Sequence, residues 1–520
     1  MKRNILKDTL VLTFIQMSLD GLSLVINVFL TKKLGTEAIG ILTLTASFFR
    51  LAAMISNGNA FLCASRFISE ELGKEERSPG IILRHCMIVG VVLSILSGAF
   101  LIGFAPWCSM HFLKSEEFAV PIRIMACSLP LLAVTACVRG WFNACCKSGI
   151  CAAADALDFL LRSGFMVIAV QCKPSLTAGT LCCLTAGSMI AGAGVQILFL
   201  LCFLSTTHAE KTGRASLSLP AYLKHAVPVM AGSALTSLLS SANDALVPVT
   251  LCQAGNSAAE AFSQFGIFEA IILPTLFFPS TILCSLAGIL VTETAREKAA
   301  GRMRRITELT EGIIRKTIVF SVYITSLLLI LGNALGELLK GGEVAGRMIV
   351  LLAPVVPFIY LEIVLESIIK GLGEQTFSSL NYLCEYMIRI SFVLLFVPLF
   401  GFYGIILSYY ASNICGNISR IVCVIRKAGM PADPVGLLGI PVFSAVFSVQ
   451  IIRLIFALLH AEPGLNLLTM CLFAAADLLL YLLIQRGLFR LSGKTSNPAG
   501  MHDLFNIAKI DKEHSCKITP

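Results

Sequence analysis

The stretch NACCKSGICAAADALDFLLRSGFMV, from Asn143 to Val167, begins with polar residues and continues as an apolar segment that contains Asp158 and Arg162. In a helix, an acidic residue four positions before an arginine lies on the same face, and this order is the favourable one. A charged pair inside an apolar helix is costly unless it faces a polar or protein-lined interior. The stretch therefore predicts a membrane helix that borders a polar interior.

The same arrangement returns in the second half of the chain, in KGLGEQTFSSLNYLCEYMIRISFVL, from Lys370 to Leu394. At one constant offset Glu385 takes the place of the first acid and Arg389 that of the first arginine. Two matching copies indicate a duplicated membrane protein in which both halves border a polar cavity.

The composition supports a membrane protein. Of the 520 residues 56% are hydrophobic and only 14% are charged, and the mean hydropathy is +0.84. Soluble domains carry about 25% charged residues, and an apolar run of about 20 residues is long enough to span a bilayer as a helix. We therefore predict an all-α polytopic protein with about fourteen spans. These are roughly residues 9–31, 38–63, 81–104, 118–142, 150–171, 177–204, 222–251, 260–290, 314–336, 346–369, 376–399, 401–425, 436–460 and 465–489.

The positions of the basic residues predict the orientation of these spans. If the N-terminus is cytoplasmic, most Lys and Arg residues, including Arg139 and Arg420, fall on the cytoplasmic side, as the positive-inside rule requires. The opposite side then holds only Lys32, Lys33, Lys114, Lys173, Lys340 and Arg347. We predict that both termini are cytoplasmic. Asp155, near a cytoplasmic helix end, is expected to be solvated.

The internal repeat predicts the domain organisation. Six spans per half is an even number, so both halves insert with the same orientation, and their pseudo-twofold axis runs along the membrane normal. Two further spans follow as an appendage, and the polar tail is expected to be disordered. The predicted parts are an N-lobe at 1–204, a cytoplasmic linker at 205–221, a C-lobe at 222–430, the extra spans at 431–490 and the tail at 491–520.

Cysteines and histidines do not suggest a metal site or a catalytic centre. Most of the 19 cysteines lie within apolar runs, where cysteine packs as a small hydrophobic residue, and none has the spacing of a zinc site. The seven histidines are scattered along the chain. We therefore expect neither a metal ion nor catalytic residues.

A resemblance to a known family supports this topology. The run LGTEAIGILTLTASFFRLAAMISNGNAFLCASRFISEELGK, from Leu34 to Lys74, resembles the second-helix region of the stage V sporulation protein B family. This family belongs to the multidrug/oligosaccharidyl-lipid/polysaccharide (MOP) exporter superfamily. The two acid-to-arginine helices are similar to the fifth and eleventh helices of that family. The chain departs from the family in its polar Asn57-Gly58-Asn59 and in Asp158, where a glutamate is expected.

The resemblance implies a MATE-like flippase in a bacterial plasma membrane, working by rocking of two lobes around a central cavity. It implies a lipid-linked oligosaccharide as the substrate, of the class of lipid II and related polyprenyl-diphosphate saccharides. The residues agree in kind, because an anionic diphosphate needs cationic groups in a wet cavity, and arginine donates paired hydrogen bonds to phosphate. Membrane lipids are the other expected partners, nucleic acid is not expected, and the protein is expected to be a monomer.

Three arginines within the spans are candidates for contact with the diphosphate: Arg50, Arg162 and Arg389. Asp158 and Glu385 would hold the last two in place. The alternative is that each pair is self-neutralised and only fixes helix packing. Arg50 has no acid at a helical spacing, so its partner must come from another helix. Asp20 or Asp244 would serve.

Acidic residues within spans are candidates for coupling transport to Na⁺ or to a proton, and no other cofactor is expected. They are Asp20, Asp244, Glu269, Glu362 and Glu366. For the first three, a salt bridge or a hydrogen bond between helices is an equal alternative. Glu362 and Glu366 are four positions apart and repel each other, so either one is protonated, which burial would favour, or the two share a cation.

Three other functions are possible in principle. A cation-coupled multidrug antiporter of the same superfamily would have a cavity dominated by carboxylates, whereas three deep arginines favour an anionic substrate. A membrane glycosyltransferase or acyltransferase would need clustered carboxylates or histidines. A non-transporting assembly scaffold would not need buried charges.

Overall fold

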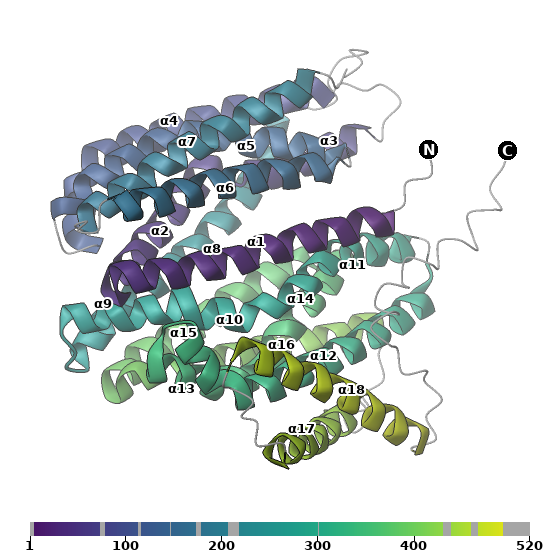
Figure 1. Cartoon of the computed structure of the whole chain (residues 1–520). Helices are drawn as coiled ribbons and strands as arrows, with labels where there is room; N and C mark the ends of the chain where they lie inside the picture. Colours follow the sequence, from purple (N-terminus) through teal and green to yellow (C-terminus); the bar gives the residue numbers. More distant parts are fainter. Residues whose placement is uncertain are drawn as a thin grey trace. The chain divides into compact units, whose positions relative to one another are not determined.

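The computed structural model describes residues 5–72, 79–112, 116–145, 147–172, 178–205, 218–299, 301–429, 438–458 and 466–491, and these residues contain helices and no β-strand (Figure 1). The first nine helices are α1 (Ile5–Leu34), α2 (Thr36–Asn57), α3 (Ala60–Leu72), α4 (Pro79–Phe112), α5 (Ala119–Ala144), α6 (Ser148–Cys172), α7 (Ala178–Ser205), α8 (Leu219–Gln253) and α9 (Ala258–Ile267). The others are α10 (Leu273–Phe277), α11 (Thr281–Ala299), α12 (Met303–Leu338), α13 (Gly342–Leu352), α14 (Val356–Gly371), α15 (Gln375–Phe400), α16 (Gly404–Ala428), α17 (Ile440–Leu458) and α18 (Leu467–Leu491).

The helices are those of a multi-pass membrane protein. Eleven helical stretches in the described residues are long and apolar enough to cross a bilayer, and one of them, Gln375–Ala428, contains both α15 and α16. Two more long helices, α6 and α8, coincide with the predicted spans at 150–171 and 222–251. Many large apolar side chains are exposed along these helices, among them Phe14, Leu399 and Leu468. Such surfaces suit contact with lipid. The predicted all-α polytopic fold is confirmed.

Three predicted spans are broken rather than continuous. The span predicted at 38–63 divides into α2 and α3 at Gly58 and Asn59, whose φ angles are 52° and 51°. The span at 260–290 is interrupted by a π-helical turn at Phe268–Ile272 and a 3₁₀ turn at Phe278–Ser280. The span at 346–369 has a 3₁₀ turn at Ala353–Val355 between α13 and α14. Hydropathy alone did not predict these interruptions, because the broken segments are as apolar as continuous ones.

The chain divides into two compact units. One comprises Ser18–Ala270 with Val397–Gly401, and the other comprises Met1–Met17, Ile271–Phe396 and Phe402–Pro520. This division differs from the predicted lobes, since α8 and α9 pack on α2 and so belong to the first unit. The lobe boundaries and the pseudo-twofold axis stay predictions. Most of the predicted linker and nearly all of the predicted tail, residues 206–217 and 492–520, lie outside the described residues.

In the first unit, α4, α5 and α7 lie side by side, and α2 crosses α9 at close range (Figure 1). Glycines permit this crossing: a Cβ on Gly40 would lie 1.8 Å from the carbonyl oxygen of Phe262, and one on Gly266 would lie 2.5 Å from the amide nitrogen of Gly40. Small residues let membrane helices approach each other closely, and packing then holds them together.

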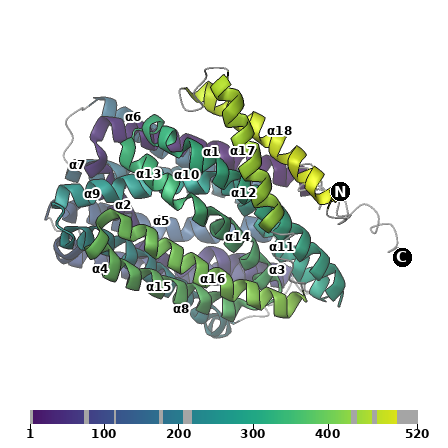
Figure 2. The ribbon, with the colours of Figure 1, turned by 90° about the horizontal axis from the view of Figure 1, so that it is seen from below.

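In the second unit, glycines also mark the crossing of α12 and α13. A Cβ on Gly336 would lie 2.2 Å from the amide nitrogen of Gly346. Beside α12, α17 and α18 lie as a pair (Figure 2), where Leu331, Ile452, Met470 and Phe473 form a small core. The appended helices are therefore packed on the second unit.

Candidate functional site

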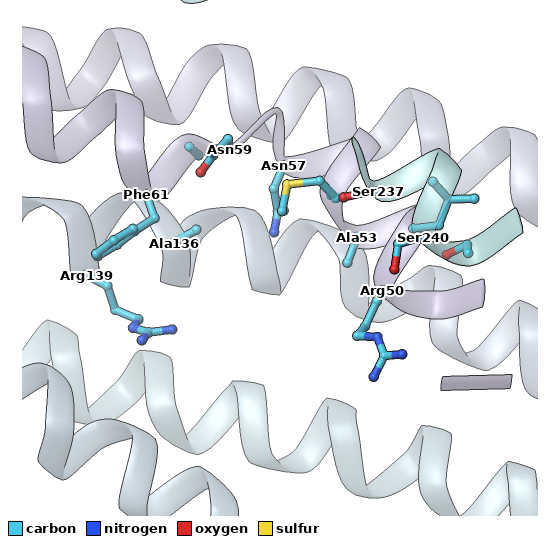
Figure 3. A pocket seen from close by; sticks show the side chains of 13 residues that line it. Arg50, Ala53, Asn57, Asn59, Phe61, Ala136, Arg139, Ser237 and Ser240 are labelled. Atoms are coloured by element: carbon cyan, nitrogen blue, oxygen red, sulfur yellow. The ribbon is translucent and has the colours of Figure 1, made fainter. Parts of the chain in front are cut away.

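A cavity of about 480 Å³ lies within the first unit, among α2, α3, α5 and α8 (Figure 3). It is in the size range of small-molecule sites. Two arginines, two asparagines and three serines line it together with apolar side chains, and none of the lining residues is acidic. The lining residues are Arg50, Leu51, Ala53, Met54, Asn57, Asn59, Ala60, Phe61, Ala136, Arg139, Ser237, Ser240 and Ser241. The cavity is therefore cationic and partly polar.

Arg50 reaches the cavity from α2. Its side chain is 65% exposed, and its Nη2 lies 3.5 Å from the Oδ2 of Asp244 on α8. The same carboxylate oxygen accepts a hydrogen bond of 2.5 Å from the hydroxyl of Ser47. Asp244 is thus one of the two partners expected for Arg50. The carboxylate of Asp244 is held mainly by Ser47, so the guanidinium of Arg50 is loosely engaged and can turn toward a ligand.

Arg139 reaches the cavity from α5. The sequence predicts for this residue only a position on the cytoplasmic side of the membrane. Its Nη2 donates to Asp155 on α6 at 2.6 Å, and its guanidinium lies 5.7 Å from the ring centroid of Phe61. Asp155 also accepts from the amide of Gln196 on α7 at 2.8 Å. Asp155, expected to be solvated, has a side chain that is 36% exposed, and two donors from neighbouring helices also engage its carboxylate.

The break between α2 and α3 forms part of the cavity wall. The N–H of Gly58 donates to the carbonyl of Met54 at 3.0 Å, which closes α2 in a left-handed turn. The amide of Asn59 donates to the hydroxyl of Ser233 on α8 at 2.8 Å and ties the break to that helix. In transporters, irregular backbone is tolerated at membrane depth where it lines a cavity. The polar triplet Asn57-Gly58-Asn59, noted as a departure from the family, thus has a place at this site.

Arg162 does not line this cavity. Its Nε donates to one oxygen of Asp158 at 2.7 Å and its Nη2 lies 2.7 Å from the other, so the predicted pair forms as a two-pronged contact on α6. A Cβ on Gly192 of α7 would lie 2.2 Å from the Oδ1 of Asp158, so the pair packs directly against that helix. This geometry supports the alternative in which the pair is self-neutralised and fixes packing.

Arg389 and Glu385 lie in the second unit, within a buried group of charges. The Nη2 of Arg389 is 3.7 Å from the Oε1 of Glu385, its Nε donates to Ser412, and its guanidinium lies 4.4 Å from the ring centroid of Tyr409. The other oxygen of Glu385 accepts from Arg420 at 2.9 Å. The predicted helical pair therefore forms, but the shorter contact of its acid is with a third residue.

Arg420 is the centre of this buried charge cluster. Its side chain is fully buried, and its Nη2 and Nε lie 3.3 Å from Glu362 and 3.4 Å from Glu366. The sequence predicts Arg420 as one of the basic residues on the cytoplasmic side. This prediction is wrong as to its surroundings, because the side chain is buried among carboxylates. Glu362 and Glu366 thus lie beside one shared cation, a guanidinium of the chain itself. Protonation of one of the two carboxyl groups, the other possibility, stays a prediction.

A pattern in the sequence could have revealed Arg420. Asn413, Asn417 and Arg420 follow at spacings of four and three, which places them on one face of α16, and all three are buried. The polar side chains would have marked this face as an interior one.

At the end of α16, the hydrogen bond and the charge of Lys427 hold the pKa of Glu374 below its usual range.

Two further candidates for ion coupling are Asp20 and Glu269. Asp20 lies in α1 and Glu269 in the π-helical turn before α10, and each interacts with other groups of the protein. Within the described part of the chain, no group of three or more His, Cys, Asp or Glu side chains could hold a metal ion.

Comparisons with known proteins agree with the resemblance found in the sequence. Residues 5–249 match a family model described as polysaccharide biosynthesis protein. The stage V sporulation protein B of Bacillus subtilis (strain 168) is 21% identical over 418 residues, which cover 78% of this chain and 80% of that protein.

Solved structures share the fold. The lipid II flippase MurJ, in an inward closed conformation, matches 92% of this chain and 99% of its own with a TM-score of 0.70 at 12% identity. The MATE multidrug transporter DinF-BH matches 82% of this chain and 96% of its own with a TM-score of 0.66 at 15% identity. At these identities the likeness to both structures establishes the fold.

Proposed function

We propose that this chain, a member of the MOP exporter superfamily, is a flippase that moves a polyprenyl-diphosphate saccharide across a bacterial plasma membrane. The observation that carries the proposal is the cationic cavity, and above all the loosely engaged guanidinium of Arg50. Arginine stays charged, and its planar fork matches the oxygens of a phosphate. A cavity lined by arginines and without acidic residues suits an anionic headgroup.

The two helical ion pairs have a supporting part in this proposal. Arg162 is bound on two sides by Asp158, and Arg389 is held by Glu385, Ser412 and Tyr409. We assign both pairs to helix packing, where removal of one member leaves an uncompensated charge. Arg50 then remains as the candidate of the three for direct contact with the diphosphate.

Alternating access, driven by Na⁺ or by a proton, is the mechanism that we propose for transport. Glu362 and Glu366 are poor sites for a soluble cation, because Arg420 already neutralises them. Asp244 is a better candidate, since it lies beside the cavity and contacts Arg50 only at 3.5 Å. An anionic substrate that draws Arg50 away would remove the positive charge beside this carboxylate, which could then take up a cation, and this would couple the two events.

The structural likeness to a MATE multidrug transporter raises extrusion of cationic drugs as a second candidate. Such a substrate needs carboxylates in the cavity, and the lining residues contribute arginines instead. We therefore expect the cavity to reject cationic drugs, as like charges repel.

Binding of undecaprenyl diphosphate to the purified protein in detergent tests the proposal. We expect Arg50→Gln to weaken binding by about tenfold or more, since a hydrogen bond to a charged group is lost. Arg347→Gln, which removes an arginine from an exposed ion pair on α13, is the matched control and should leave the affinity unchanged. Equal affinity in the wild type and in Arg50→Gln, or tighter binding of a cationic drug than of the diphosphate, would argue against the proposal.

A further inference from the structure

We infer that the cavity takes a saccharide that carries a second anionic group, such as a carboxylate on a sugar, and that Arg139 binds this group. The inference rests on the proposed function, because it assumes that Arg50 holds the diphosphate. It adds a substrate class, the acidic saccharides, and a specificity-determining residue.

The two arginines reach the cavity from different helices, Arg50 from α2 and Arg139 from α5. Figure 3 shows the side chains of Arg139 and Arg50 apart from each other, with Ala136, Asn57 and Ala53 between them. The guanidinium of Arg139 lies over the ring of Phe61, eleven residues after Arg50 along α2 and α3. We therefore assign the diphosphate to Arg50 and a second anionic group to Arg139.

The wall between the arginines suits a sugar. Asn57, Asn59, Ser237, Ser240 and Ser241 line the cavity and offer hydroxyl and amide groups. Such groups pair with the hydroxyls of a saccharide, and apolar side chains such as Leu51 and Met54 line the cavity together with them. A substrate that extends from Arg50 to Arg139 therefore places its sugar against polar side chains and its far end beside the second guanidinium.

Arg139 keeps donors available beside its own carboxylate partner. A guanidinium has five N–H donors, and Asp155 takes up one end of it through Nη2. The Nε of Arg139 is buried and has no partner among the described residues. A buried donor without a partner calls for an explanation, and an acceptor supplied by a ligand after a small turn of the side chain is one. Asp155, fixed by Gln196, acts as a positioning residue that holds the guanidinium at the wall.

The test compares two substrates that differ in one group. Undecaprenyl-diphosphate disaccharides are prepared with a terminal hexuronic acid or with the matching neutral hexose, and their affinities for the purified full chain are measured. We expect the wild type to bind the acidic form about tenfold more tightly, the preference expected from one hydrogen-bonded charge pair. Arg139→Gln should abolish this preference and change the affinity for the neutral form less than twofold.

Two variants guard against a loss of folding. Arg139→Gln combined with Asp155→Asn removes both charges of the pair, so that no unpaired carboxylate is left buried, and should lose the preference in the same way. Arg139→Lys keeps the charge and should keep part of the preference. Arg347→Gln, remote in sequence and on the other unit, should keep all of it.

The outcomes separate this inference from the proposed function. If the wild type binds both forms equally, or if Arg139→Gln weakens the binding of both forms to the same extent, Arg139 does not bind a second anionic group. The inference is then wrong. In either case the proposed function stands as long as Arg50→Gln still weakens both. If the wild type binds neither form, the proposed function itself fails.

Discussion

Single residues place positive charge in two different settings in this protein. Arg50 is largely exposed and loosely engaged beside a cavity, whereas Arg420 is fully buried among Glu362, Glu366 and Glu385. The first setting leaves donors free for a ligand. The second uses them to satisfy carboxylates that α14 and α15 bring into the interior, which indicates a structural part for Arg420.

Replacement of Arg420 by methionine should therefore destabilise the protein. Removing one partner leaves buried carboxylates uncompensated, at a cost of about 3–5 kcal/mol. Unfolding by titration with SDS, or thermal unfolding in detergent, measures the change. Arg426→Met, six residues later and exposed, is the control and should change stability by about 0.5 kcal/mol or less. Equal stability of the two variants would contradict a structural part for Arg420.

Some of these residue contacts could be predicted from the sequence and others could not. The pairs Asp158–Arg162 and Glu385–Arg389 follow from helical spacing, and both form. The contacts of Arg420 join residues 35, 54 and 58 positions apart, which no local pattern specifies. Arg139 is a similar case, since its partner Asp155 lies on the next helix, across a turn.

Helices in the first unit depend on close backbone contacts at glycines. Gly40 lies where α2 crosses α9, and a Cβ there would overlap the carbonyl oxygen of Phe262. Sequence analysis predicted the apolar helices in their order, because hydropathy depends only on the helix itself. It missed the breaks at Gly58 and at Ala353–Val355, because these depend on what the neighbouring helices offer to the freed backbone groups.

We expect Gly40→Ala to destabilise the protein by about 3 kcal/mol, because the new methyl group meets backbone rather than a flexible side chain. Gly103→Ala on α4 is the matched control, since nothing lies within 4 Å of a Cβ at that position. It should be neutral or stabilising by up to about 1 kcal/mol. Thermal unfolding of both variants in detergent checks the pair, and a Gly40→Ala variant as stable as Gly103→Ala would refute the packing argument.

For the whole molecule, the sequence predicted an all-α polytopic membrane protein, and the fold confirms it, with solved structures of 12% to 15% identity sharing that fold. The repeat in the sequence is visible as matching ion pairs, but these pairs have different surroundings. Asp158 is paired with Arg162 on its own helix, while Glu385 is shared between Arg389 and Arg420. The duplicated pattern therefore predicted the helices correctly and the environment of each pair only in part. The orientation of the termini stays a prediction.

Translocation of a labelled undecaprenyl-diphosphate saccharide across proteoliposomes tests the central claim most directly. The wild type should move the label from the inner to the outer leaflet faster than protein-free liposomes do. Arg50→Gln should slow this movement by about tenfold or more, while Arg347→Gln should not. Movement by the wild type no faster than in protein-free liposomes, or an unchanged rate in Arg50→Gln, would contradict the account.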